Sequence, residues 1–249
     1  MLYYQTFGSR EHQPLLLLHS GGMAGVEWQP QIPLWQERYY VIVPDLLGHG
    51  QSALPAGEKL SIDGLGRAVL AMLDELGIEK VNVCGSSMGG ATALWLAVHH
   101  PERVKRAIIY RISYHKNPAT YAQTRQMADP AYWQQFGLQS WLSKIHEPQG
   151  GAEAWKMVIQ RVSESLDPET SAHDHELSAL ERLKMPVLLI TGDRDPVAPL
   201  DDVLAMYRVI PHAELWVMPA ASHITASNTW RAAAFAEEVR RFLSRPLPE

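Results

Sequence analysis

A serine surrounded by small residues lies between a short apolar run and a helical pattern. The segment 84–90 reads C-G-S-S-M-G-G, and Ser87 is the central residue of its G-x-S-x-G motif. The apolar run 81–84 leads into the motif, and residues 91–99 have a composition that favours a helix. A sharp turn from strand to helix exposes the central hydroxyl, and glycines let neighbouring backbone approach it. This context predicts that Ser87, rather than Ser86, is a nucleophile.

A serine hydroxyl needs a base to accept its proton, and His223 lies where such a base is expected. Serine is a weak nucleophile at neutral pH, so a neighbouring imidazole must take the proton. His223 follows the last apolar run, 215–218, and precedes a predicted closing helix at about 228–243. In chains with this kind of nucleophile turn, the histidine comes last in the order serine, acid, histidine. We therefore predict that His223 is the general base.

Two carboxylates follow the preceding apolar run and are candidates for orienting the histidine. The segment 191–196 reads T-G-D-R-D-P and offers Asp193 and Asp195. Gly192 makes the turn out of the strand, and a residue three positions further on can reach across to the histidine. Asp193 is better placed to accept hydrogen bonds from turn amides or to pair with Arg194. We favour Asp195 as the third member of the triad, with Asp193 as the alternative.

Backbone amides near the serine are expected to stabilise negative charge on a substrate oxygen. The residue after the nucleophile, Met88, begins a helix whose positive end faces the reaction centre. A second donor is expected from the loop H-S-G-G that follows the first central run, 15–18. The predicted oxyanion hole therefore consists of the amides of Gly21 and Met88.

These residues suffice for acyl transfer to water without a cofactor or a metal ion. Two other histidine groups, at 99–100 and 173–175, fall at a helix end and in a polar stretch, and we interpret neither as a metal site. The predicted substrate is a small-molecule ester or lactone. Its acyl length is not encoded in any pattern of the sequence, and neither is the oligomeric state.

Six short apolar runs alternate with helix-compatible segments along the chain. They comprise residues 15–18, 40–43, 81–84, 104–110, 187–191 and 215–218. Such runs are typical of strands buried on both faces of a parallel sheet. Between the second and third runs, apolar residues recur at helical spacing, with Ser61 placed to cap the start of the helix and Gly77 its end. The pattern predicts an α/β fold with a mostly parallel, doubly wound sheet flanked by helices.

Residues 113–181 interrupt this alternation because they contain no strand-like run and are rich in Trp, Tyr, Gln and Met. Proline rarely continues a helix, so the prolines of this stretch divide it into about three or four short helices. We predict that 113–181 is a helical cap inserted into a core domain formed by 1–112 and 182–249. A cap has to face the site somewhere, so aromatic residues are candidates for substrate binding. The candidates are Trp28, Tyr114, Trp133, Trp141 and Trp155.

The motifs together resemble the α/β-hydrolase superfamily over nearly the whole chain. The resemblance is carried by the order of the 85–89 motif, Asp195 and His223, together with the run P-D-L-L-G-H-G-Q-S at 44–52. With the segment around Trp28, that run is similar to the branch of esterases, enol-lactonases, carbon–carbon hydrolases and cofactor-free haloperoxidases. The resemblance implies hydrolysis of an ester or lactone through an acyl-enzyme on Ser87.

Two departures from the family pattern bear on function. Ser20 stands where many relatives have the glycine of an H-G dipeptide, which leaves the oxyanion donor open. Ile224 follows the histidine where ring-cleavage hydrolases typically have tryptophan, which weighs against carbon–carbon cleavage. That alternative, hydrolysis of a vinylogous diketone, requires a cap arginine, for which Arg125 and Arg161 are candidates. A second alternative is a receptor-like homologue that binds a ligand in the same pocket.

Composition and charge restrict the partners. The formal net charge is −5, and the basic residues form no stripe that could follow a phosphate backbone, so nucleic acid is not expected. The single cysteine, Cys84, lies in an apolar run and is interpreted as a buried strand residue, which fits a reducing compartment. Neither a signal peptide nor a membrane-spanning run of 18 or more apolar residues is evident, so we expect a cytoplasmic protein without membrane contact.

Overall fold

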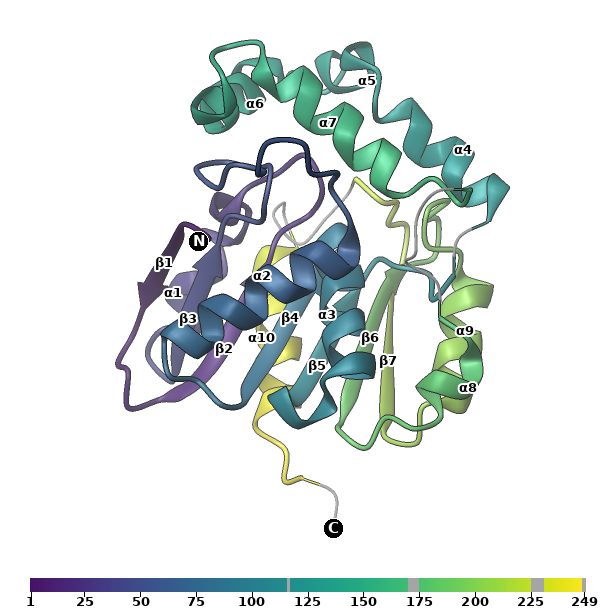
Figure 1. The fold of residues 1–249 in the computed structure, drawn as a ribbon. Helices are drawn as coiled ribbons and strands as arrows, with labels where there is room; N and C mark the ends of the chain where they lie inside the picture. The colour runs from purple at the N-terminus through teal and green to yellow at the C-terminus, as the bar shows by residue number, and fades with distance from the viewer. Residues whose placement is uncertain (116, 170–174, 225–230, 248–249) are drawn as a thin grey trace.

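The computed structural model describes residues 1–115, 117–169, 175–224 and 231–247, and these form one twisted sheet with helices on both faces (Figure 1). The sheet has seven strands in the order β1-β3-β2-β4-β5-β6-β7. Only β1 is antiparallel to its neighbour, and the other pairs are parallel. The strands are β1 Tyr4–Phe7, β2 Gln13–Leu18, β3 Tyr39–Pro44, β4 Val81–Ser86, β5 Val104–Tyr110, β6 Val187–Gly192 and β7 Ala213–Met218. The prediction of a mostly parallel α/β sheet is confirmed.

Ten α-helices and three short 3₁₀-helices accompany the sheet within the described residues. The α-helices are α1 Ile32–Trp35, α2 Ile62–Glu75, α3 Met88–His99, α4 Pro118–Gln126, α5 Pro130–Gln134, α6 Gln139–His146, α7 Ala154–Ser165, α8 Leu177–Leu180, α9 Leu200–Val209 and α10 Ala232–Leu243. The 3₁₀-helices are η1 Gly25–Trp28, η2 Pro101–Arg103 and η3 Glu147–Gln149. None of these helices combines the length and the apolar character that crossing a membrane requires.

The apolar strands are buried on both faces, because successive side chains of a strand point to opposite sides. In β2, Leu16 and Leu18 belong to a core shared with α2 and α3, while Leu15 and Leu17 belong to a second core shared with α1 and α10. Figure 1 shows α2 and α3 on one face of the sheet and α10 on the other. Five of the six apolar runs therefore form inner strands between two layers of helices, and the sixth, in β7, lies at the edge of the sheet.

The long helix α2 begins and ends as its sequence predicts. The hydroxyl of Ser61 accepts a hydrogen bond from the amide of Gly64, one of the donors that a helix N-terminus leaves unpaired. Gly77, just past the last turn, adopts φ +68°, a conformation that glycine reaches without strain. The closing helix also forms, although α10 begins at Ala232. The first residues predicted for it, up to 230, lie outside the described part.

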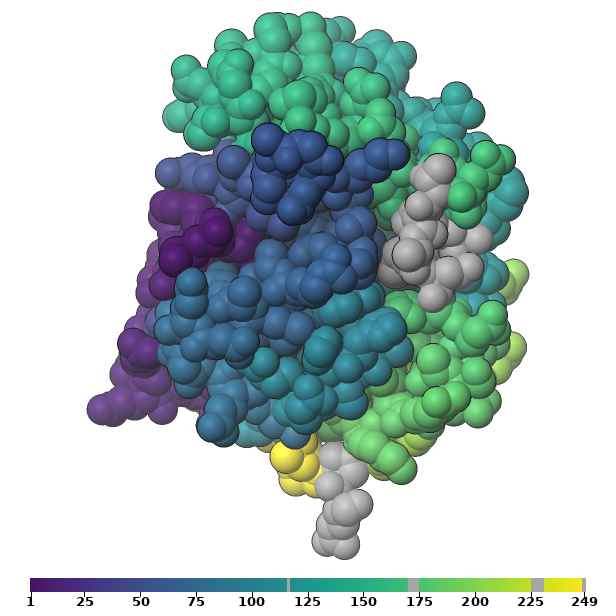
Figure 2. Space-filling view, viewed as in Figure 1, coloured from purple at the N-terminus to yellow at the C-terminus, as the bar shows by residue number. Residues whose placement is uncertain are grey.

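Helices α4 to α7 form a layer over the carboxyl ends of the strands, as Figures 1 and 2 show. Pro118 and Pro130 are the first residues of α4 and α5, where a missing amide hydrogen costs nothing. The layer has a small apolar core of its own, formed by Trp133, Leu142, Trp155 and Ile159. Within its described residues, 117–169 and 175–181 among them, the stretch 113–181 contains five α-helices rather than the expected three or four. The division into core domain and inserted cap stays a prediction, since Leu180 of α8 packs into the core of the sheet.

Candidate active site

The chain turns sharply at Ser87 between a strand and a helix. β4 ends at Ser86 and α3 begins at Met88, which leaves Ser87 as the only residue between them. Ser87 has φ 52° and ψ −118°, a backbone conformation that is strained for a residue with a side chain. Its amide donates to the carbonyl of Tyr110 at 2.8 Å, which anchors the turn to the end of β5. The serine is therefore held out of the strand at the carboxyl edge of the sheet.

Glycines on both sides of the serine make this turn possible. A Cβ atom on Gly85 would lie 2.1 Å from the carbonyl oxygen of Gly89, and one on Gly89 would lie 2.2 Å from that of Leu18. Both obstructions are backbone atoms, which cannot rotate away. The motif thus contains glycine because strand, turn and helix approach more closely than any side chain permits.

Three predicted residues from three separate loops form one hydrogen-bonded chain. The hydroxyl oxygen of Ser87 lies 3.0 Å from Nε2 of His223. On the other side of the ring, Nδ1 lies 2.9 Å and 3.0 Å from the two carboxylate oxygens of Asp195. The Asp195 side chain is fully shielded from solvent, and that of His223 is 7% exposed. This geometry lets the imidazole take a proton from the serine while the carboxylate fixes the ring.

The two candidate acids have different surroundings. Asp195 also accepts hydrogen bonds from the amides of Val197 and Ala198. Burial alone would raise the pKa of Asp195, but the charge and hydrogen bond of His223, with the Ala198 amide, hold that pKa below its usual value. Asp193 instead accepts from the amide of Ala221, the kind of turn contact expected for it. Of the two carboxylates, Asp195 is the one in contact with the histidine.

Of the three backbone amides in the loop after β2 that are candidates for the oxyanion hole, the amide of Gly21 is the one that can still donate. The amide of Ser20 is already used, because it donates to Oε2 of Glu27 at 2.6 Å. The amide of Gly22 donates to Nε2 of His49. The Gly21 amide has no partner among the described residues, and Met88 starts α3 beside Ser87. The serine that replaces the family's glycine therefore does not compete with Gly21 for the oxyanion, and the roles of Gly21 and Met88 stay predictions.

A buried ion pair that the sequence did not reveal lies directly behind these residues. Arg111, just after β5, and Glu27, in η1, are each about 95% buried, and their charged atoms are 3.5 Å apart. The guanidinium also donates to the hydroxyls of Ser20 and Ser86 and to the backbone carbonyl of His223. The sequence offered one signal for this role of Arg111: it is a charged residue directly after an apolar run. The carboxyl ends of parallel strands meet at the site, so a residue in that position lies close to it.

Three buried histidines join the loops beneath the helical layer. The rings of His19, His49 and His146 lie in sequence, with centroids 5.1 Å and 5.8 Å apart. His49 accepts from the amide of Gly22, and His146 accepts from Gly50 and donates to the carbonyl of Gly22. Burial lowers the pKa of all three, that of His146 to about 4. The three imidazoles therefore link α6 and the loop after β3 to the loop after β2, which contains Gly21. Their lowered pKa values favour the neutral form of each ring.

A cavity of about 530 Å³ opens above Ser87 and His223. Its walls come from the loop after β2 and from α4, α6 and α7, and they are mostly apolar. Two of the five predicted substrate-binding aromatics, Trp133 and Trp141, line it. Ile224, the residue that stands in place of the ring-cleavage tryptophan, also faces this space.

The other three predicted substrate-binding residues do not line the cavity. Trp28 is fully buried beneath the sheet, with its ring beside those of Trp35 and Phe235. Trp155 is fully buried in the small core of the helical layer. Tyr114 stacks on His115 away from the cavity wall. The structure does not place these three in the cavity wall: Trp28 and Trp155 pack in cores, where large aromatic side chains are stable, and Tyr114 is partly exposed elsewhere.

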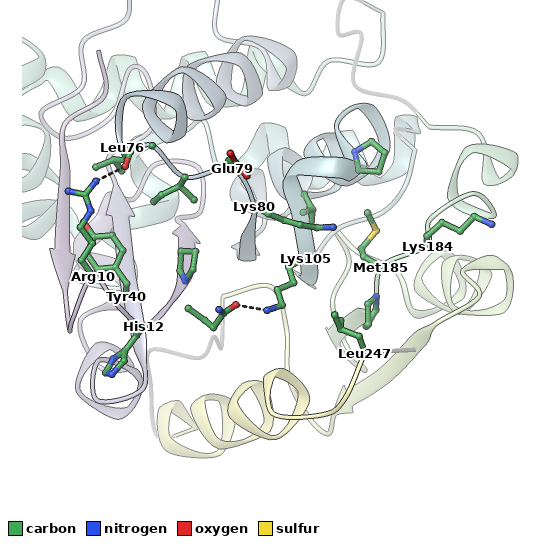
Figure 3. A pocket seen from close by; sticks show the side chains of 17 residues that line it. Arg10, His12, Tyr40, Leu76, Glu79, Lys80, Lys105, Lys184, Met185 and Leu247 are labelled. Atoms are coloured by element: carbon green, nitrogen blue, oxygen red, sulfur yellow. Dashed lines mark hydrogen bonds between the residues drawn. The ribbon is translucent and has the colours of Figure 1, made fainter. Parts of the chain in front are cut away.

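A larger cavity of about 720 Å³ lies at the opposite end of the sheet (Figure 3). It is an open groove at the amino ends of the strands, and Arg10, Lys80, Lys105 and Lys184 surround it. Its lining does not include Ser87, His223 or Asp195. The volume of a cavity alone therefore does not identify the reactive site. No group of three possible metal ligands occurs in the described part of the chain, and residues 173 and 174 of the second histidine group lie outside it.

Comparisons with known proteins agree with this fold. A family model described as the alpha/beta hydrolase fold matches residues 13–139. A 3-oxoadipate enol-lactonase of Acinetobacter baylyi is 33% identical, over 98% of this chain and 93% of its own. A 2-hydroxymuconate semialdehyde hydrolase of a Pseudomonas species is 28% identical over 93% and 87%. The crystal structure of an enol-lactonase from Burkholderia xenovorans superposes with a TM-score of 0.77 at 26% identity, over 98% of this chain and 96% of its own. The chain therefore belongs to the alpha/beta hydrolase fold family.

Proposed function

We propose that the protein hydrolyses small to medium carboxylic esters or lactones through an acyl-enzyme on Ser87. The observation that carries the proposal is the hydrogen-bonded chain from Ser87 through His223 to Asp195, opening into an apolar cavity. A strained, partly exposed serine beside an oriented imidazole is suited to attack on a carbonyl carbon.

The chemistry follows from the atoms in contact. Nε2 of His223 takes the proton as the Ser87 oxygen forms a bond to the substrate carbonyl carbon. The amides of Gly21 and Met88 stabilise the negative charge that develops on the carbonyl oxygen. The imidazolium then gives its proton to the leaving oxygen as the ester bond breaks. For a lactone this oxygen stays tethered to the acyl group.

Water completes the cycle by the same route in reverse. His223 removes a proton from a water molecule, which attacks the acyl carbon and releases the acid from Ser87. Asp195 keeps Nδ1 of the ring protonated and stabilises the imidazolium in both halves of the reaction. The residues of this chain provide every proton transfer in the scheme.

The relatives support an oxygen-ester substrate over a carbon–carbon bond. Two of the comparisons name enol-lactonases, which open a lactone. The carbon–carbon alternative called for a cap arginine at the site, but neither Arg125 nor Arg161 lines the cavity. No specific contact favours the receptor-like alternative. A protein that only binds a ligand has no need of an oriented imidazole beside the serine.

A panel of p-nitrophenyl esters and of γ- and δ-lactones tests the proposal. We expect turnover by the wild type and a loss of at least about 1,000-fold in kcat for Ser87→Ala. A fluorophosphonate probe followed by mass spectrometry should modify the peptide that contains Ser87 and no other. Equal rates for the two proteins would rule out the acyl-enzyme. Ligand binding that persists in Ser87→Ala, with negligible wild-type turnover, would favour the receptor-like alternative.

A further inference from the structure

The cavity above Ser87 contains one basic side chain with a permanent charge. Among the described residues that line it, Arg111 is the sole lysine or arginine. The other charged side chain of the wall is Glu27, which pairs with it. Among the described residues, the positive charge that the cavity offers a ligand therefore depends on whether Arg111 is available.

The guanidinium of Arg111 is already engaged by the protein. Nε donates to the Ser86 hydroxyl at 3.2 Å, and Nη2 donates to the hydroxyls of Ser86 and Ser20 at 2.7 Å and 2.8 Å. Nη1 donates to the carbonyl of His223. All three nitrogens thus have protein acceptors, and the Glu27 carboxylate balances the charge. A substrate carboxylate would therefore compete with Glu27 and with these acceptors for the cation.

An unpaired carboxylate would be unfavourable elsewhere in the cavity. No side chain that covers it from above is charged, and most are apolar, among them Met127, Leu138, Trp141 and Ile159, with the hydroxyls of Thr124 and Ser163 as the polar groups. Moving a carboxylate from water to such a surface without a counter-ion is strongly unfavourable, because the charge loses its hydration. The Glu27 carboxylate in the wall adds repulsion. The cavity is suited to an acyl group that has no charge of its own.

We propose that the substrate is a neutral ester or lactone with an apolar acyl portion, and that substrates with a second, free carboxylate are rejected. This inference rests on the proposed function and narrows it. Adipate, muconate and succinate appear in names of relatives, and each denotes a carboxylate. The names of these relatives suggest substrates that carry a carboxylate. For this protein, the part of the substrate away from the reacting carbonyl would instead be neutral.

Three esters with the same six-carbon acyl chain form the test. They are p-nitrophenyl hexanoate, mono-p-nitrophenyl adipate, in which a carboxylate replaces the terminal methyl group, and the methyl ester of that adipate, which is larger but neutral. We expect kcat/KM for the free carboxylate to be at least about 100-fold below the value for hexanoate. The methyl ester should recover most of this loss. Comparable kcat/KM for hexanoate and the free carboxylate would overturn the inference and leave the proposed function intact.

A cation introduced into the apolar wall provides the converse test. Met127 in the wall is partly buried and unbranched, so Met127→Lys places an ammonium there with little change in shape. We expect kcat/KM for the adipate monoester to rise at least about tenfold, while Met127→Gln, a neutral control of similar size, gives no such gain. A selective loss of adipate activity in Arg111→Met would mean that Arg111 binds the carboxylate, against the inference. Absence of Ser87-dependent turnover of both neutral esters would instead overturn the proposed function, and the inference with it.

Discussion

The guanidinium of Arg111 donates a hydrogen bond to the backbone carbonyl of His223. The same side chain contacts the hydroxyls of Ser20 and Ser86, the residues that immediately precede the predicted oxyanion donor and the nucleophile. One side chain at the end of β5 therefore joins the three loops that must keep their relative positions during acyl transfer. Because catalysis depends on distances of about 3 Å, this makes Arg111 a positioning residue for the proposed reaction.

Arg111→Met should weaken both the fold and the proposed reaction. The substitution leaves the Glu27 carboxylate buried without its counter-ion, which costs about 3–5 kcal/mol of unfolding free energy. With a neutral ester we expect kcat to fall while KM changes little, because the lost contacts hold the loops rather than the substrate. Urea unfolding and steady-state kinetics measure the two effects.

The double variant Arg111→Met with Glu27→Gln is the control for the ion pair. Removing both charges should restore part of the lost stability, because no unpaired charge remains buried. The kcat should stay low, since the link to the His223 carbonyl is still absent. A single variant within about 1 kcal/mol of the wild type would mean that the pair contributes little.

Asp195→Asn and Asp193→Asn form a matched pair that tests the choice of acid. An asparagine at 195 cannot stabilise the imidazolium, so we expect kcat to fall by about 1,000-fold to 10,000-fold. Asp193 contacts the Ala221 amide at the surface, so its replacement should leave kcat within about threefold of the wild type. Ester hydrolysis at saturating substrate gives both values. The reverse ranking would assign the orienting role to Asp193.

The sequence predicted those features of the structure that leave a signature in neighbouring residues. Runs such as 15–18 predicted strands because both faces of a central strand are buried, and all six runs are strands. Ser87 was predicted because a strand, a glycine turn and a helix each leave a local signature. Asp195 and His223 were placed by chain order, and the structure brings His223 to the serine and Asp195 to the histidine.

Features that depend on packing between distant segments could not be predicted in this way. Arg111 is a single charged residue after an apolar run, and its contact at His223 is 112 positions away in the chain. Trp28 and Trp155 have the same side chain as Trp141, and only the packing of the surrounding helices decides which ring faces the cavity. Single-residue chemistry is thus readable from sequence, while the shape of the pocket is not.

Trp155→Ala and Trp141→Ala should separate a core residue from a cavity residue. Trp155 is fully buried, so its truncation leaves a void and should cost about 3–5 kcal/mol of unfolding free energy. Trp141 is partly exposed in the cavity wall, so its truncation should cost less and shift the preference towards longer acyl chains. Urea unfolding and a series of p-nitrophenyl esters measure these effects. Equal destabilisation by the two substitutions would contradict the assignment.

The histidine cluster predicts a loss of stability in mild acid. Burial lowers the pKa of His146 to about 4, while an unfolded chain titrates near 6.5. Between these values the unfolded state binds more protons, so the unfolding free energy falls as the pH falls. The contribution of His146 is complete above about pH 6.5 and is lost towards pH 4, which amounts to about 3 kcal/mol. The pKa values of His19 and His49 are lowered too, and their contributions act in the same direction.

Urea unfolding at several values between pH 7.5 and pH 4.5 measures this dependence. We expect a shallower decline for His146→Gln than for the wild type, because one of the depressed groups no longer titrates. His212→Gln is the matched control, since His212 is exposed and outside the cluster, and it should follow the wild-type curve. Parallel curves for His146→Gln and the wild type would mean that His146 takes up its proton equally in both states. Protonation of Nδ1 of His146 removes the acceptor for the Gly50 amide, so the link between α6 and the loop after β3 should weaken over the same pH range.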